Sequence, residues 1–239
     1  MKLFIIRYTK IIFAYLRLHV FFNLFSRFFL NLNYLIRFSS WVSKNRKIEY
    51  NDFPCRWDYK KRYPMYEWVI KNEGLSTMVI NYIEFGVADG YSFRWFVSQN
   101  SNPTSRFYGF DTFTGLPEDF GVYKKGQFDT NNKVPEISDV RIKFYQGLFQ
   151  QTLPGFLLAF NRKERNVIMM DADLYSSTLY TLTTMAPFLK KDDIIFFDEF
   201  AVPTHEFKAF SDFMQSYYIN LQLIAAANNY YFVAFKVVS

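Results

Sequence analysis

The sequence predicts an α/β protein with a doubly wound, mostly parallel seven-stranded sheet and a helical N-terminal extension. After residue 74, short apolar runs alternate with stretches of helical periodicity, a pattern typical of parallel strands covered by helices on both faces. The 239 residues are 50% hydrophobic and 21% charged, which suits a large buried core and excludes a mostly disordered protein. The turn-like pair Asn228-Asn229 joins the last two runs, so we expect a hairpin with one antiparallel strand at the sheet edge.

The predicted elements follow in order along the chain. Seven apolar runs are the predicted strands, at residues 78–87, 106–111, 142–146, 166–171, 193–198, 221–226 and 230–238. A helix is predicted to begin near Tyr63-Pro64, because proline favours the first helical turn. Further helices are predicted at residues 92–99, 149–161, 176–189 and 204–218. Residues 115–138 follow neither period and are predicted to form a long loop, which is more often functional than idle.

Two rare residue types limit the possible chemistry. The single cysteine, Cys55, excludes an internal disulfide framework and a zinc site built from several thiolates. The chain contains only two histidines, which excludes a histidine-rich metal site. Any metal ion is therefore expected to be held mainly by oxygen atoms.

The positive net charge of the chain comes from its first 47 residues. They contain nine Lys/Arg and no acidic residue, whereas residues 48–239 contain 19 Lys/Arg against 22 Asp/Glu. We therefore treat residues 1–47 as an extension and residues 48–239 as the main domain. Because the main domain is slightly acidic, no nucleic-acid partner is expected for it.

The extension is predicted to form amphipathic helices rich in aromatic residues. It contains no run of 18 uncharged apolar residues, so an ordinary membrane-spanning helix is not expected. Arg7, Lys10 and Arg17 share one helical face, and a broad apolar surface lies beside it. One interpretation is that this surface packs on the main domain or on a second copy of the chain. The other is that it lies on an anionic membrane, which would add a peripheral position on the inner membrane face to an expected cytoplasmic location.

The first two strands of the main domain end in residues that suit a nucleoside-containing cofactor. Gly86 and Gly90 lie in the turn after the first strand, where glycine lets the backbone approach a ligand closely. Asp111 ends the second strand, where a carboxylate accepts hydrogen bonds from two ribose hydroxyls. The alternatives are a simple tight turn and a helix cap. No Lys-Ser/Thr pair follows the turn, which disfavours nucleoside-triphosphate hydrolysis.

Acidic residues follow two later strands that are expected to be neighbours. Asp171 and Asp173 follow one of them, and Asp198 and Glu199 follow the other. Clustered carboxylates repel one another unless a cation or a proton lies between them. A hard divalent ion, Mg²⁺ or Mn²⁺, held by Asp171, Asp198 and Glu199 is the simplest arrangement. Alternatively, Asp173 caps the next helix and Glu199 faces solvent.

An ordered set of motifs resembles the macrocin O-methyltransferase-like family. The motifs are the glycine turn and residues 111–117 (DTFTGLP), 152–154 (TLP) and 171–178 (DADLYSST). Members of this family are class I S-adenosylmethionine-dependent methyltransferases that act mostly on sugar hydroxyls. The resemblance covers roughly residues 60–239 and implies a Rossmann-like methyltransferase fold. The extension lies outside it.

The resemblance assigns expected roles to residues around the cofactor. The methionine end of S-adenosylmethionine would be lined by Glu84, Gly86 and Gly90, and the ribose would be held by Asp111. Gln146 and Gly147 would lie near the adenine. These roles follow from the matched motif positions alone.

The resemblance also implies a metal-assisted transfer. Asp171 and Asp198 match metal positions of the family, and Glu199 stands where the family has Asp or Asn. A metal ion would lower the pKa of the acceptor hydroxyl, and a carboxylate would take its proton. Asp171 is the first choice for this base, with His205 as an alternative, although a single histidine there is more often structural.

The sequence therefore predicts an S-adenosylmethionine-dependent O-methyltransferase that modifies a hydroxyl of a sugar or glycan with the help of a divalent metal ion. One alternative keeps the cofactor and replaces the sugar by a phenol or another small-molecule hydroxyl. The other is a membrane-associated scaffold with a vestigial cofactor site. The expected partners are a sugar or glycan acceptor, an anionic membrane surface at residues 1–47 and a further copy of the chain.

Overall fold

A single mixed sheet forms the centre of the computed structural model, which describes residues 2–239. Its eight strands lie in the order β1-β7-β8-β6-β5-β2-β3-β4. Every neighbouring pair is parallel except the two that involve β8, which runs antiparallel to β6 and β7. The strands are β1 (Tyr50–Asn51), β2 (Ile80–Phe85), β3 (Arg106–Asp111), β4 (Ile142–Gln146), β5 (Arg165–Met170), β6 (Ile194–Phe197), β7 (Leu221–Ala227) and β8 (Phe232–Val237).

The α/β class and the mostly parallel sheet are confirmed, with two corrections. The sheet has eight strands and not seven, because the two-residue β1 pairs with β7. The final hairpin was expected to leave its antiparallel strand at the edge, but β8 lies inside the sheet between β6 and β7. A hairpin pattern fixes which two strands follow one another, whereas the position of the pair in the sheet depends on contacts distant in sequence.

Helices cover both faces of the sheet. They are α1 (Lys2–Tyr15), α2 (His19–Lys44), α3 (Arg62–Asn72), α4 (Tyr91–Gln99), α5 (Phe149–Leu158), α6 (Tyr175–Met185) and α7 (Glu206–Tyr217), with short 3₁₀ turns η1 (Tyr59–Lys61) and η2 (Ala186–Phe188). One core cluster lies between the sheet and helices α5, α6, α7 and the end of α2. The other lies between the sheet and helices α3 and α4.

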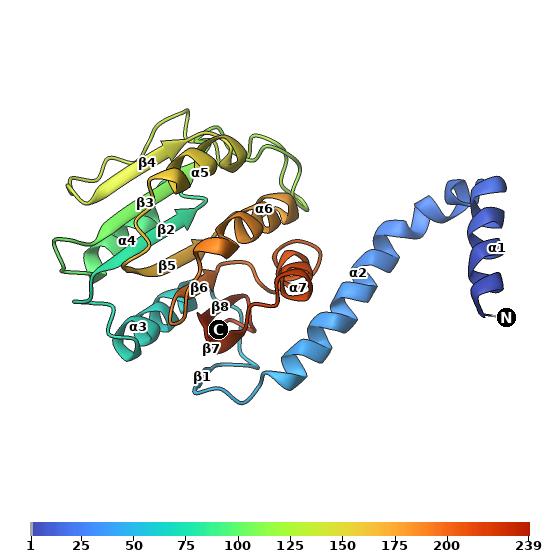
Figure 1. Cartoon of the computed structure of the whole chain (residues 1–239), viewed down its shortest axis with the longest axis horizontal. Helices are drawn as coiled ribbons and strands as arrows, with labels where there is room; N and C mark the ends of the chain where they lie inside the picture. The colour runs from blue at the N-terminus through green and yellow to red at the C-terminus, as the bar shows by residue number, and fades with distance from the viewer. Residues whose placement is uncertain (1) are drawn as a thin grey trace.

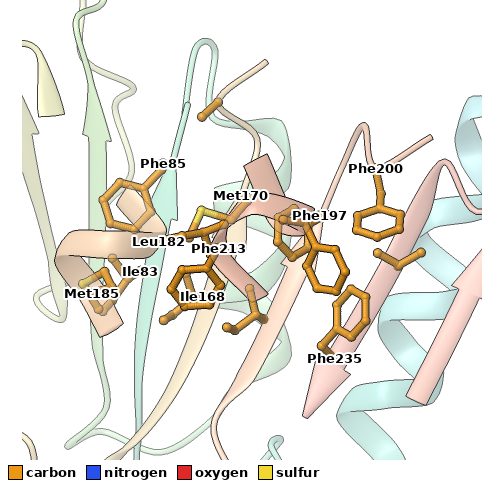
Figure 2. Close-up of a cluster of buried hydrophobic side chains, with 14 of the residues drawn as sticks. Ile83, Phe85, Ile168, Met170, Leu182, Met185, Phe197, Phe200, Phe213 and Phe235 are labelled. Carbon is orange, nitrogen blue, oxygen red and sulfur yellow. The ribbon is translucent and has the colours of Figure 1, made fainter. Parts of the chain in front are cut away.

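Side chains that alternate along each strand contribute to both core clusters. Ile195 and Phe197 of β6 belong to the first cluster, whereas Ile194 and Phe196 belong to the second, because successive strand residues point to opposite faces. Figure 2 shows part of the first cluster, in which Leu182 of α6 lies against side chains of the sheet. Burial on both faces is why these strands appear in the sequence as continuous apolar runs.

The extension forms two helices that meet at a sharp bend. The angle between α1 and α2 is 111°, and Figure 1 shows both extending away from the sheet except at the end of α2. There Trp41 contacts the rings of Phe200, Phe207 and other aromatic residues of the main domain. Among residues 2–239, no helix alone is long and apolar enough to cross a membrane, although the bent pair meets the criterion jointly.

Candidate active site

A pocket of about 560 Å³ lies at the carboxyl ends of the central parallel strands. This edge is where doubly wound sheets bind their ligands, and the volume is typical of a small-molecule site. The pocket is lined by residues 86–88, 111–112, 115–118, 148–151, 171–173 and 176–177 together with Tyr59, Phe128 and Glu199. Residues that follow β2, β3, β4, β5 and β6 thus line one cavity.

The glycine turn after β2 lets two strand ends approach each other. Gly86 has a φ of +92°, and a Cβ built on it would lie 1.7 Å from the backbone oxygen of Asp171. No side chain fits there, so glycine is required to close the pocket floor. Gly90 has a φ of +73° and precedes α4, away from the pocket lining. Of the two predicted glycines, Gly86 therefore reaches the site and Gly90 shapes the turn.

Asp111 connects the glycine turn to the end of β3. Its Oδ2 atom accepts hydrogen bonds from the backbone N–H groups of Val87 and Ala88 at 2.7 and 2.8 Å, and its Oδ1 accepts one from Phe113 at 2.7 Å. The carboxylate also lines the pocket. It therefore faces the pocket and holds the glycine turn in place.

Three carboxylates line the wall formed by β5 and β6. Asp171 and Asp173 follow β5, and Glu199 follows β6. Burial, together with the charges of Asp198 and Asp173, raises the pKa of Asp171 well above its usual value. Burial and the neighbouring Glu199 raise the pKa of Asp173 to about 8, and burial raises the pKa of Glu199 to about 7. These groups are therefore stronger proton acceptors than free carboxylates.

Comparison with known proteins identifies the domain that carries this pocket. Residues 83–200, from β2 to just beyond β6, match the family model described as a methyltransferase domain. The protein is an S-adenosylmethionine-dependent methyltransferase. The class I Rossmann-like fold predicted from the sequence is confirmed with it.

Solved structures share the fold of this methyltransferase. The calicheamicin methyltransferase CalS11 is 22% identical over 73% of this chain and 76% of that chain, with a TM-score of 0.55. An apo structure of CalS11, described as a TDP-rhamnose 3'-O-methyltransferase, gives a TM-score of 0.51 at 23% identity, over 74% of this chain and 80% of that chain. The O-methyltransferase NovP is 20% identical over 76% of this chain and 79% of that chain, with a TM-score of 0.57. None of the curated protein sequences compared with the chain matches it.

Three further residues predicted to bind the cofactor do not line the pocket. Glu84 of β2 is fully buried behind the turn, where it accepts hydrogen bonds from Tyr82 and Ser92. Gln146 is exposed and donates to Asn132, and Gly147 lies one residue before the lining segment 148–151. Leu148 and Gln150, and not Gln146, therefore line the pocket after β4.

Glu84 makes the stability of the methyltransferase depend on pH. Burial raises the pKa of Glu84 to about 8, so the folded chain keeps a proton that the unfolded chain has already released above about pH 4.5. Stability from this group is therefore lost as the pH rises from about 4.5 to about 8. Glu84→Gln keeps the shape of the side chain but removes its titratable carboxyl group. Between pH 5 and pH 8 we therefore expect the melting temperature to fall less for the variant than for the wild type.

Thermal unfolding followed across this pH range measures the effect. The exposed Glu136→Gln change is the matched control and is expected to leave the wild-type pH dependence unchanged. Parallel curves for Glu84→Gln and the wild type would mean that Glu84 is already ionised in the folded protein.

Asp198, which is predicted to be a metal ligand, is buried and does not line the pocket. Its Oδ1 accepts a hydrogen bond from Tyr66 at 2.7 Å, and its Oδ2 accepts one from Tyr59 at 2.9 Å. The guanidinium of Arg62 forms an ion pair with the same carboxylate at 3.2 Å, and both side chains are buried. Burial lowers the pKa of Arg62, but the charge of Asp198 and the neighbouring Tyr66, Tyr59 and Tyr63 together outweigh it and keep the pKa above the usual value.

The predicted metal-ligand set is therefore not assembled. Asp171 and Glu199 reach the pocket, whereas Asp198 is neutralised by Arg62 behind it. Within residues 2–239, no group of three or more His, Cys, Asp or Glu side chains is arranged to hold a metal ion. Glu199 instead accepts a hydrogen bond from Tyr231 at 2.7 Å. The donor set offered by these residues does not fit the divalent ion that the sequence predicted.

His205 also lies outside the pocket lining, so the structure does not support it as the alternative base. Its Nδ1 atom accepts a hydrogen bond from the backbone N–H of Tyr175 at 3.4 Å. Its ring lies edge-on to Phe120, with 4.7 Å between the ring centroids. Burial lowers the pKa of His205. The histidine joins the long loop to the start of α6, and this role is structural.

Sequence reasoning missed the polar residues that precede β2 along the chain. Tyr59, Arg62, Tyr63 and Tyr66 have the i, i+3, i+4, i+7 spacing of one helical face, and this spacing was the available signal. Tyr59 lines the pocket and Arg62 holds Asp198. The long loop was predicted correctly as irregular, and residues 115–118 and Phe128 within it form part of the pocket wall.

Proposed function

We propose that this methyltransferase transfers a methyl group from S-adenosylmethionine to a hydroxyl of a sugar or glycan. The observation that carries the proposal is the row of carboxylates, Asp171, Asp173 and Glu199, on the pocket wall beside the glycine turn. A hydroxyl becomes a good nucleophile only if its proton is taken as it reacts. The turn side of the pocket suits the cofactor, and the carboxylate side suits an acceptor that must lose a proton.

The residues of the pocket fit the cofactor. Gly86 leaves room where any side chain would collide, and Asp111 presents a carboxylate at the end of β3. Residues 148–151 at the start of α5 complete the opposite end of the cavity. When bound, S-adenosylmethionine supplies a methyl group activated by its positively charged sulfur. The chain therefore mainly has to align the acceptor oxygen and remove its proton.

Asp171 is the residue that we assign as the base. It follows β5, which lies between β2 and β6 in the sheet, and it lines the pocket. The acceptor oxygen forms its bond to the methyl carbon while the bond between that carbon and sulfur breaks, and the hydroxyl proton passes to Asp171. The charge balances because the positive sulfur becomes a neutral thioether as the proton is released.

The sugar acceptor is supported by the family resemblance and by the neighbouring folds. CalS11 is described as a TDP-rhamnose 3'-O-methyltransferase and NovP as an O-methyltransferase. Hydroxyl-rich acceptors also suit a wall of several carboxylates, since neighbouring hydroxyls donate hydrogen bonds to neighbouring acceptors. A phenolic acceptor would need only one proton acceptor.

We assign no step to a divalent metal ion, because the positive charge beside Asp198 is already supplied by Arg62. Methyl transfer is therefore expected to be unchanged by EDTA. Loss of transfer in EDTA and its recovery with Mg²⁺ or Mn²⁺ would overturn this assignment and would require Asp171, Asp173 and Glu199 to hold the ion.

Two measurements test the proposed function in sequence. In thermal unfolding, S-adenosylmethionine at about 100 times its dissociation constant is expected to add about 2.7 kcal/mol of stability. Incubation with labelled cofactor and a panel of nucleotide-linked sugars, lipid-linked sugars and phenols then identifies the acceptor. Labelled sugar supports the proposal. Labelled phenol without labelled sugar would replace the acceptor, and cofactor binding without any labelled product would contradict it.

A further inference from the structure

The first two helices expose an apolar surface that the main domain does not cover. No residue of α1 is buried, and within α2 the buried residues are Tyr34 and Val42. Large apolar side chains, including Ile5, Ile12, Phe21 and Phe28, have at least half of their surface exposed. Continuous apolar exposure on this scale marks an interaction site in a folded protein.

The exposed surface lies on a different side of α2 from the one that contacts the main domain. Tyr34, Phe38 and Trp41 face the domain. Phe21, Phe25, Phe28, Phe29 and Leu32 are exposed, and at 3.6 residues per turn they are centred roughly 160° around the helix from that contact. Packing of α2 on its own domain therefore leaves them without a partner.

The charges of the same segment decide between two kinds of partner. Residues 1–47 contain nine Lys/Arg and no Asp or Glu. A second copy of the chain, docked through these helices, would bring two such sets of positive charges together without an acidic residue of the extension between them. An anionic lipid surface offers both an apolar boundary and negative headgroups, so it complements the apolar and the basic residues at once.

We infer that α1 and the first half of α2 bind the surface of a membrane that contains anionic lipids. Phe21, Phe25 and Phe28 enter the boundary between headgroups and acyl chains, and Arg7, Lys10, Arg17 and Arg27 contact the headgroups. Contact of the end of α2 with the main domain then holds the pocket near the membrane. This binding surface is independent of the proposed methyl transfer.

Vesicle flotation of the full-length chain tests the inference. We expect binding to vesicles of phosphatidylcholine with phosphatidylglycerol, and much weaker binding to phosphatidylcholine alone. Changing Arg7, Lys10, Arg17 and Arg27 to Gln is expected to weaken anionic-vesicle binding roughly fivefold per residue, because each basic side chain contributes about that factor at such a surface. The triple change Phe21→Ser, Phe25→Ser and Phe28→Ser is expected to weaken binding to both vesicle types by more than about tenfold.

A control and a folding check keep the result unambiguous. Val140 and Leu158 are 102% and 92% exposed on the main domain, and changing both to Ser is expected to leave flotation unchanged. Stabilisation by S-adenosylmethionine reports folding of every variant and does not depend on vesicles. Absence of vesicle binding by the wild type, or equal binding by all variants, would overturn the inference. A dimer that the Phe→Ser changes dissociate, without vesicle binding, would assign the surface to a second copy.

Discussion

Asp198→Ala is expected to lower the free energy of unfolding by about 3–5 kcal/mol, because it leaves the charge of Arg62 buried without a partner. Arg62 is 7% exposed and Asp198 is 1% exposed, so water does not replace the lost carboxylate. Tyr59 and Tyr66 lose their shared acceptor at the same time. In a domain of this size the change corresponds to a fall of roughly ten degrees in melting temperature.

Denaturant and thermal unfolding of the purified variants measure this effect. The exposed Lys124–Asp119 pair serves as the control, with side chains 77% and 57% exposed, and Asp119→Ala is expected to leave the melting temperature unchanged. The double variant Arg62→Met with Asp198→Asn removes both charges and is expected to recover part of the lost stability. Equal effects of Asp198→Ala and Asp119→Ala would show that the Arg62–Asp198 ion pair does not stabilise the fold.

Asp171→Asn is expected to lower kcat for methyl transfer by about 10²–10⁴-fold, because the amide keeps the shape of the carboxylate but does not accept the hydroxyl proton. The affinity for S-adenosylmethionine is expected to stay close to that of the wild type, since the substitution introduces no larger group beside Gly86. Transfer of a labelled methyl group and calorimetric titration of the cofactor measure the two quantities separately.

The alternative base provides the matched control for this experiment. His205 lies outside the pocket lining, so His205→Gln is expected to change kcat by no more than severalfold. The assignment of Asp171 would be wrong if His205→Gln removed activity while Asp171→Asn retained it. Equal and large losses in cofactor affinity would instead make Asp171 a binding residue.

The sequence predicted where strands and helices lie along the chain better than it predicted which of them lie side by side in the fold. The bounds predicted for residues 106–111 and 142–146 match β3 and β4, because apolar runs and their flanking turns are local properties of the chain. The strand β1 has two residues, which is too short for any periodicity. The interior position of β8 depends on its pairing with β6 across more than thirty residues, and no local pattern records that pairing.

The site was predicted in part for a similar reason. Gly86, Asp111, Asp171 and Glu199 line the pocket as the strand-end argument required. Asp198 and Glu199 are consecutive residues that directly follow β6, and their side chains diverge. One of the pair therefore faces the pocket, and the other faces α3. The partner of Asp198 there, Arg62, is 136 residues away in the sequence, so nothing near the motif identified it.

Experiments that remove the first helices depend on the residue at which the chain is truncated. Trp41 lies 4.9 Å from Phe200, measured between ring centroids, and Phe200 directly follows the pocket residue Glu199. A protein that begins at residue 48 would lack Trp41 and leave a void in the aromatic cluster behind that wall. A protein that begins just before Tyr34 would keep this support and still lack Phe21, Phe25 and Phe28. Only the second truncation separates the exposed surface from the catalytic pocket.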